Sequence, residues 1–197
     1  MIAIDRMTID SPPAGFSFAR TGGGADGKWQ VVAEATAKGG RAIEQQSADH
    51  TDYRLPLAIH ESFSAKDLIM QARFKPVAGK IDQAGGVVVR LADPDNYYVA
   101  RANALENNVR FYRVVAGRRQ QLGTANIRVT SNEWHVLAVR AEGDRYTVSY
   151  DGAVLFEVKD DTFPDAGGVA LWTKADSVTR FDQVTLTILH SAVRTPE

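Results

Sequence analysis

The chain has 197 residues, 44% of them hydrophobic and 24% charged, which is the composition of a globular protein with a sizeable core. Its formal charge of −1 creates no overall field that would attract nucleic acid or an anionic membrane, so we predict neither as a partner. The absence of cysteine excludes disulfides, thiolate catalysis and cysteine-based zinc sites.

The first segment of the chain carries Asp5 and Asp10 at positions where a signal peptide would be apolar. No run of about 18 apolar residues, the length that a transmembrane helix needs, occurs in the sequence. We therefore predict no signal peptide within this sequence, and a secreted or periplasmic location would require a leader that has been removed. No linker divides residues 1–197, which we predict to form a single domain.

Alternation of apolar and polar residues, the pattern of strands with one buried face, dominates the chain from residue 67 onward. Turn residues interrupt it, and the Asp-Gly pair at 151–152 suits a type I′ hairpin turn. Strands that recur roughly every 8–15 residues, with no convincing helix, favour a sandwich or barrel. The Pro-rich segment SPPAG at 11–15 leads into the first predicted strand, and the other predicted strands lie within residues 67–77, 84–92, 96–104, 108–122, 133–143, 144–161, 167–173 and 178–189.

Two segments carry a resemblance to a known fold: EWHVLAVRAEGDRYTVSYDGAVLFEV at 133–158 and GGVALWTKADSVTRFDQVTL at 167–186. They resemble the C-terminal half of concanavalin A-like, laminin G-like jelly rolls, in which a Trp-His strand, an Asp-Gly hairpin and a Gly-x-x-x-Leu-Trp strand follow in that order. Over residues 60–188 the chain is similar to the bacterial family named for 3-keto-disaccharide hydrolase and its uncharacterised relatives. The resemblance implies an all-β, single-domain, two-sheet antiparallel jelly-roll sandwich.

In jelly rolls of this class the outer face of the curved sheet forms a concave groove. Strand 96–104 places Arg101 and Asn103 on one face, where their side chains can hydrogen-bond to neighbouring sugar hydroxyls. Exposed arginines also cover ordinary solvated strands, so a solvated face stays open as the alternative.

The strand around residue 170 is expected to end at this groove. Val169 and Leu171 have the parity of the core between the sheets, which leaves Trp172 and Lys174 on the other face. We expect Trp172 to act as a stacking platform for a sugar ring rather than as a core residue. The predicted ligand-binding residues are Gln83, Arg90, Arg101, Asn103, Arg110, Trp172, Lys174 and Asp176.

Three functions remain open on these residues. The first is a lectin-like or accessory module whose partner is a carbohydrate or glycoside. The second, implied by the resemblance, is a glycoside hydrolase or lyase with Asp82, Asp176 or Lys174 as acid or base and with Arg90 and Arg101 beside a developing anion. The third, by fold analogy, is a protein-interaction domain of laminin G type.

The sequence leaves enzymatic activity undecided. Enzymes of the 3-keto-disaccharide hydrolase type carry an NSG segment followed by a Glu-x-Gln strand, and residues 83–87 here read QAGGV with no such strand after them. The four histidines have no metal-ligand spacing, so we predict no cofactor and assign no metal ligands. Some jelly rolls of this class hold a structural calcium ion, for which the sequence singles out no ligands.

Overall fold

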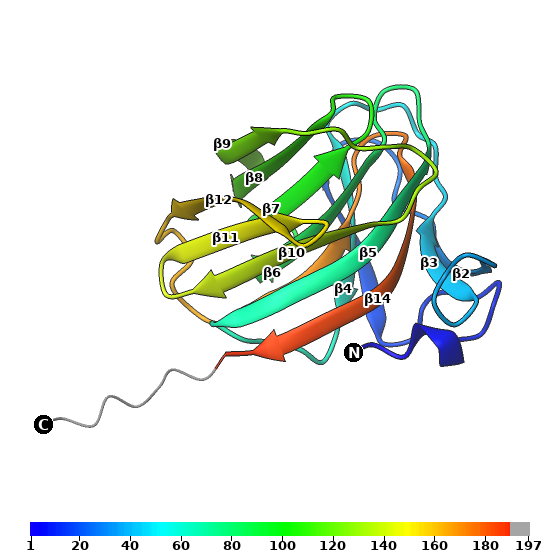
Figure 1. The fold of residues 1–197 in the computed structure, drawn as a ribbon, viewed down its shortest axis with the longest axis horizontal. Coiled ribbons are helices and arrows are strands. Elements are labelled where there is room, and N and C mark those ends of the chain that lie inside the picture. The colour runs from blue at the N-terminus through cyan, green and yellow to red at the C-terminus, as the bar shows by residue number, and fades with distance from the viewer. Residues whose placement is uncertain (190–197) are drawn as a thin grey trace, which may run out of the picture.

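The structure is a computed structural model that describes residues 1–189, and it consists of two antiparallel seven-stranded sheets packed face to face (Figure 1). Sheet A has the strand order β1-β4-β13-β6-β7-β8-β9, and sheet B has the order β12-β11-β10-β5-β14-β3-β2. The predicted all-β sandwich is confirmed, and no helix among the described residues is long and apolar enough to cross a membrane. The elements are η1 (Ile4–Arg6), β1 (Phe16–Gly22), β2 (Trp29–Ala33), β3 (Arg41–Gln45), β4 (Arg54–His60), β5 (Leu68–Ala78), β6 (Ala84–Asp93), β7 (Asn96–Asn103), β8 (Asn108–Val115), β9 (Arg118–Asn126), β10 (His135–Glu142), β11 (Arg145–Tyr150), β12 (Ala153–Lys159), β13 (Gly168–Trp172) and β14 (Val178–Ile188).

Strands β13 and β14 each pair with strands that lie far away in the sequence. In sheet A, β13 lies between β4 and β6, so that Trp172 stands opposite Leu57 on one side and Gly86 on the other. In sheet B, β14 lies between β5 and β3, with Phe181 opposite Phe74 and Ile43. The two strands therefore join the N-terminal third of the chain to the remainder of both sheets.

The predicted hairpins form where the turn residues stand. Asp151 and Gly152 have φ of 47° and 82°, the positive values that a type I′ turn requires between β11 and β12. Ala116 and Gly117, with φ of 48° and 74°, connect β8 to β9 in the same way. Strands β2, β3 and β4 were not among the predicted strands.

The main core lies between the sheets and follows the period of two along each strand. Val169 and Leu171 belong to it, as predicted, together with Val87, Phe74 and Phe181. Aromatic rings fill its centre, where Tyr98 stacks on Phe111 with ring centroids 5.7 Å apart and contacts Tyr146 at 4.4 Å.

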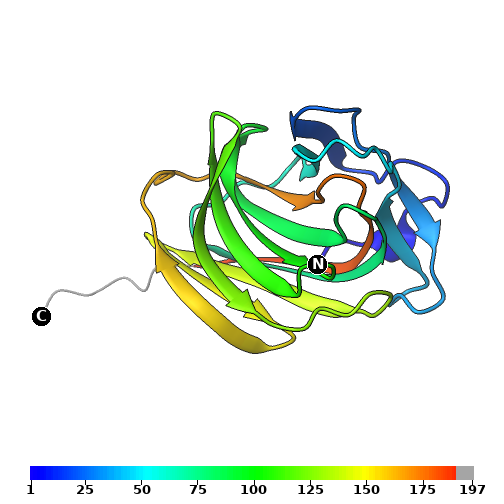
Figure 2. The same ribbon diagram turned by 90° about the horizontal axis from the view of Figure 1, so that it is seen from above.

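A second apolar cluster covers the outer face of sheet A, which lies on the inside of the bend of strands β6–β9 (Figure 2). Trp172, Tyr97, Val99 and Leu57 have no exposed surface there. Antiparallel sheets commonly leave one face to water, whereas this face carries its own core. The cluster is completed by Leu55, Ala84, Val88, Leu91, Tyr112, Val114 and Ala170.

Hydrogen bonds at two places connect distant strands of sheet A around this second core. The Thr21 hydroxyl on β1 donates to the carbonyl oxygen of Pro94 at 2.6 Å and lies 2.8 Å from the Tyr97 hydroxyl. Tyr53 donates its hydroxyl proton to the carbonyl of Gly117 at 2.8 Å and accepts a hydrogen bond from the backbone of Arg119. The tips of the β6–β7 and β8–β9 hairpins are thereby tied to the β1–β4 edge.

Candidate functional site

Beside the second core, three arginines surround one tyrosine on the outer face of sheet A. Arg101 on β7 stands directly opposite Arg110 on β8, and Arg119 lies on β9. Nitrogen atoms of Arg101 and Arg110 lie 3.4 and 3.5 Å from the Tyr112 hydroxyl. The Arg119 guanidinium lies 4.9 Å from the centre of the Tyr112 ring and 5.3 Å from that of Tyr53. We call Arg101, Arg110, Arg119 and Tyr112 the arginine cluster.

One carboxylate contacts this cluster. Glu106, in the β7–β8 turn, accepts a hydrogen bond from Arg101 at 2.8 Å and lies 3.4 Å from Arg110. Burial raises the pKa of Glu106, but the charge of Arg101, a hydrogen bond from Asn108 and the charge of Arg110 together leave it below its usual value. The side chain of Arg101 is almost fully buried, while those of Arg110 and Glu106 are 33% and 39% exposed and accessible to a ligand.

The same arginines act on Tyr112. Burial raises the pKa of its hydroxyl, yet the charge of Arg101 and hydrogen bonds from Arg110 and Arg101 hold the pKa below its usual value. Its oxygen therefore lies in a strongly positive environment.

A second polar group, formed by Lys174 with Asp82, Asp52 and Asn103, lies beside the arginine cluster. The Lys174 ammonium donates to Asp52 at 2.8 Å and to the buried Asp82, which also accepts a hydrogen bond from the side chain of Asn103. Burial lowers the pKa of Lys174, but its bonds to Asp52 and Asp82 outweigh this effect and raise it. Lys174 therefore carries a positive charge that lies against both carboxylates.

Asp176 holds the turn before β6. Its buried carboxylate accepts backbone hydrogen bonds from Lys80 at 2.6 Å and from Ile81 and Asp82 at 3.0 Å. Burial raises its pKa, but these N–H donors lower it by more, so that the pKa lies below the usual value. The carboxylate oxygens of Asp176 are therefore directed at backbone N–H groups, and the Lys174 ammonium is directed at Asp52 and Asp82.

Replacing Asp176 with asparagine should cost about 1–3 kcal/mol of unfolding free energy at pH 7, because the negative charge is removed and an NH2 group, itself a donor, replaces one of the two oxygens that accept from backbone N–H groups. A carboxyl with a lowered folded-state pKa stabilises the protein above its unfolded pKa, and this stability is lost as the pH falls through the folded value. The gap between wild type and Asp176→Asn in urea unfolding should therefore shrink from pH 7 to pH 3. An unchanged gap would show that the charge is not the stabilising element.

The remaining predicted site residues lie in different places. Gln83 donates its side-chain amide to the carbonyl of Gly79 at 3.1 Å and accepts a bond from Ser131, at the rim beside Asn103. Trp172 points to the outer face, as its parity predicted, but it has no exposed surface. The expectation of an exposed stacking platform is corrected: Trp172 is a core residue of the second cluster.

Arg90 does not lie on the outer face, which corrects its predicted position. A β-bulge breaks the pairing of β6 after Val89, and Arg90 itself has a φ of 49°. Because a bulge breaks the alternation of side chains, the Arg90 guanidinium turns toward sheet B, 5.2 Å from the Tyr146 ring. There it donates to the carbonyl oxygens of Phe163 at 2.9 Å and Gly143 at 2.6 Å.

Five residues of the arginine cluster and its contacts were missed as candidates: Tyr112, Asn108, Arg119, Glu106 and Tyr53. Tyr112 and Asn108 share the face of Arg110 by the period of two, so this alternation could have identified them. Glu106 in a turn and Tyr53 before β4 carry no such signal, because their positions depend on the tertiary fold.

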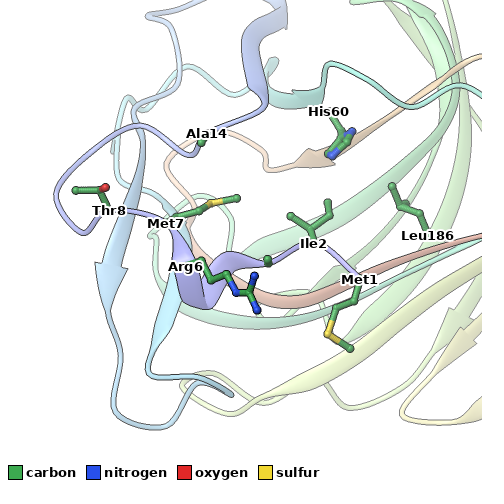
Figure 3. Close-up of a pocket in the computed structure, with 9 residues that line it drawn as sticks. Met1, Ile2, Arg6, Met7, Thr8, Ala14, His60 and Leu186 are labelled. Atoms are coloured by element: carbon green, nitrogen blue, oxygen red, sulfur yellow. The ribbon is translucent and has the colours of Figure 1, made fainter.

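A cavity of about 560 Å³ lies elsewhere, beside the N-terminal segment (Figure 3). Ile2, Met7, His60 and Leu186 line it, together with Arg6, and its surface is mainly apolar. No group of three or more histidine or acidic side chains within residues 1–189 is placed to hold a metal ion.

No protein-family model and no curated protein sequence matches the chain. Among solved structures, the carbohydrate-binding module CBM66 from Bacillus subtilis is similar, with a TM-score of 0.67 and 21% identity over 86% of this chain and 94% of that one. A Bacillus subtilis protein of unknown function with a galectin-like fold superposes with a TM-score of 0.61 and 8% identity, over 87% and 89% of the two chains.

A carbohydrate esterase from the Shiga toxin-encoding bacteriophage phi24B has the same architecture, with a TM-score of 0.54, 17% identity and coverage of 87% and 89%. At these identities the similarity shows the fold, and the chain is a jelly roll of the concanavalin A-like kind.

Proposed function

We propose that the protein binds carbohydrate at the arginine cluster on the outer face of sheet A. The observation that carries the proposal is the convergence of Arg101, Arg110 and Arg119 on Tyr112, at the rim of a face that is bent and internally cross-linked. Guanidinium groups make paired, directional hydrogen bonds to adjacent oxygens, and a rigid support keeps the entropic cost of binding low. The similar carbohydrate-binding module supports the same class of ligand.

The ligand would contact the accessible part of this region. Arg110 is partly exposed and supplies donors for the oxygen atoms of a sugar, and Glu106 beside it is also partly exposed. Arg119 and Tyr53 are also partly exposed and present a stacked guanidinium and ring. Trp172 would act indirectly, by filling the floor beneath them.

Replacing Arg110 with alanine should weaken glycan binding by about 1.5–3 kcal/mol, roughly 10-fold or more in Kd, because hydrogen bonds from a charged donor are lost. A glycan array would identify ligands, and titration calorimetry would measure both proteins. Arg145→Ala is the matched control, since Arg145 is also a partly exposed arginine paired with a glutamate, Glu157, but lies on sheet B. Equal affinities for wild type and Arg110→Ala would place the binding site elsewhere.

A further inference from the structure

In the arginine cluster, the guanidinium groups outnumber the carboxylates that contact them. Three guanidinium groups converge on Tyr112, and the carboxylate that contacts them among the described residues is Glu106. Arg101 and Arg110 stand directly opposite each other across β7 and β8, an arrangement of like charges that destabilises a sheet. An anion bound beside them would offset this repulsion.

Two donors in the cluster lack an acceptor. The Nε atoms of Arg110 and Arg119 are buried and have no hydrogen-bond partner within residues 1–189. Buried polar atoms are nearly always hydrogen-bonded in folded proteins, so these two arginines have fewer bonds than their donors allow. A ligand's acceptor oxygens would bond to the accessible part of Arg110, whose side chain is 33% exposed.

The neighbouring acids do not fill this role. Asp82 and Asp52 are both bound to Lys174, and Asp82 also accepts from Asn103. Asp82 is directed at the ammonium, while the charge of Arg119 also helps to lower the pKa of Asp52, after the bond and charge of Lys174. Asp52 therefore offsets part of the charge of Arg119, and Arg101 and Arg110 keep Glu106 as their contacting carboxylate.

We propose that the arginine cluster recognises the carboxylate of an acidic saccharide, a hexuronate residue of a glycan. This inference rests on the proposed carbohydrate-binding function and names its ligand class. The carboxylate would accept hydrogen bonds from the arginines, and the exposed Glu106 would compete with it for Arg101 and Arg110. Recognition therefore depends on one C6 substituent, a carboxylate in place of a hydroxymethyl group.

The test compares sugars that differ at that carbon alone. Titration calorimetry with glucuronate and glucose oligosaccharides, and with galacturonate and galactose oligosaccharides, should give a Kd about 10-fold lower or more for the acidic member of the preferred pair. The methyl ester of the uronate should bind like the neutral sugar, and added salt should weaken the acidic ligand selectively. Titration with acetate alone tests whether a carboxylate without a sugar is sufficient for binding. If acetate binds as tightly as the uronate, the proposal is overturned.

Two variants should change uronate affinity in opposite directions. Arg110→Gln should weaken uronate binding about 10-fold and remove most of the preference over the neutral sugar. Glu106→Gln should strengthen uronate binding several-fold, because it removes the competing carboxylate, while Glu157→Gln on sheet B serves as its control.

The outcomes distinguish a failure of the uronate inference from a failure of the proposed carbohydrate binding. Equal binding of acidic and neutral sugars, weakened alike by Arg110→Gln, would overturn the uronate inference and leave carbohydrate binding in place. Binding of neither kind of saccharide would overturn the proposed function and the inference with it. Weaker uronate binding by Glu106→Gln would contradict the competition between the two carboxylates.

Discussion

Trp172→Ala should lower the unfolding free energy by about 3–5 kcal/mol, because removal of a fully buried tryptophan leaves a cavity that its neighbours fill only partly. Trp172 lies within the second core with Leu57, Val99 and Tyr97, and a Cβ at Gly86 would come within 3.1 Å of its ring. For a domain of this size the melting temperature should fall by about 6–20 °C. Differential scanning calorimetry measures this directly.

Trp134→Ala is the matched control for that experiment. Trp134 is partly exposed and lies under Arg73, whose guanidinium is 4.7 Å from the ring centre. Loss of an exposed cation–π contact should cost about 1 kcal/mol or less. Similar melting temperatures for the Trp172→Ala and wild-type proteins would show that the outer face of sheet A carries no second core.

Arg54→Met should destabilise the protein by about 3–5 kcal/mol, because a fully buried guanidinium has no substitute for its hydrogen bonds. Arg54 donates to the carbonyl oxygens of Ala25 at 2.5 Å, Asp26 at 3.0 Å and Ala175 at 2.6 Å, and to the hydroxyl of Ser47 at 2.8 Å. Methionine fills much of the volume but leaves these buried acceptors without a donor.

Urea unfolding should show the loss as a lower midpoint for Arg54→Met, with Arg140→Met as the control, since Arg140 is exposed and paired with Glu142. Limited proteolysis should also cut the segments 23–28 and 46–52 faster in Arg54→Met, because Arg54 joins them to the end of β13. A midpoint equal to that of the control would mean that these carbonyl oxygens find other donors.

Alternation and turn chemistry predicted the strands from β5 onward. Strands β5, β10 and β11 each have one buried face, and the β8–β9 and β11–β12 turns have a clear signature. Strand β4 contains Pro56, which argues against an interior strand, yet β4 lies between β1 and β13. Strands β2 and β3 are five residues each and follow glycine-rich segments, so their alternation is short.

The candidate site was less predictable than the fold, for physical reasons at particular residues. The alternation of side chains along each strand correctly placed Arg101, Arg110 and Trp172 on the outer face of sheet A. Whether a side chain on that face is exposed to solvent depends on which other parts of the chain cover it. Trp172 packs in a cluster with Leu57, Tyr97 and Val99, which come from other strands. The links from Thr21 to Pro94 and from Tyr53 to Gly117 each span more than 60 positions, so local alternation cannot predict either feature. The predicted position of Arg90 was wrong because a bulge changes the alternation of side chains along β6.

The positions of β13 and β14 within the sheets have a consequence for how the chain folds. Each is inserted between two strands that precede it by roughly 80–140 residues, so neither sheet can be completed until the C-terminal part of the chain has been made and has paired with both neighbours. Pairings across such sequence separations slow folding because loop-closure entropy is lost before contacts compensate. We expect refolding to be slow, in milliseconds to seconds, and the unfilled gaps beside β4 and β5 to be the points at which incomplete chains associate.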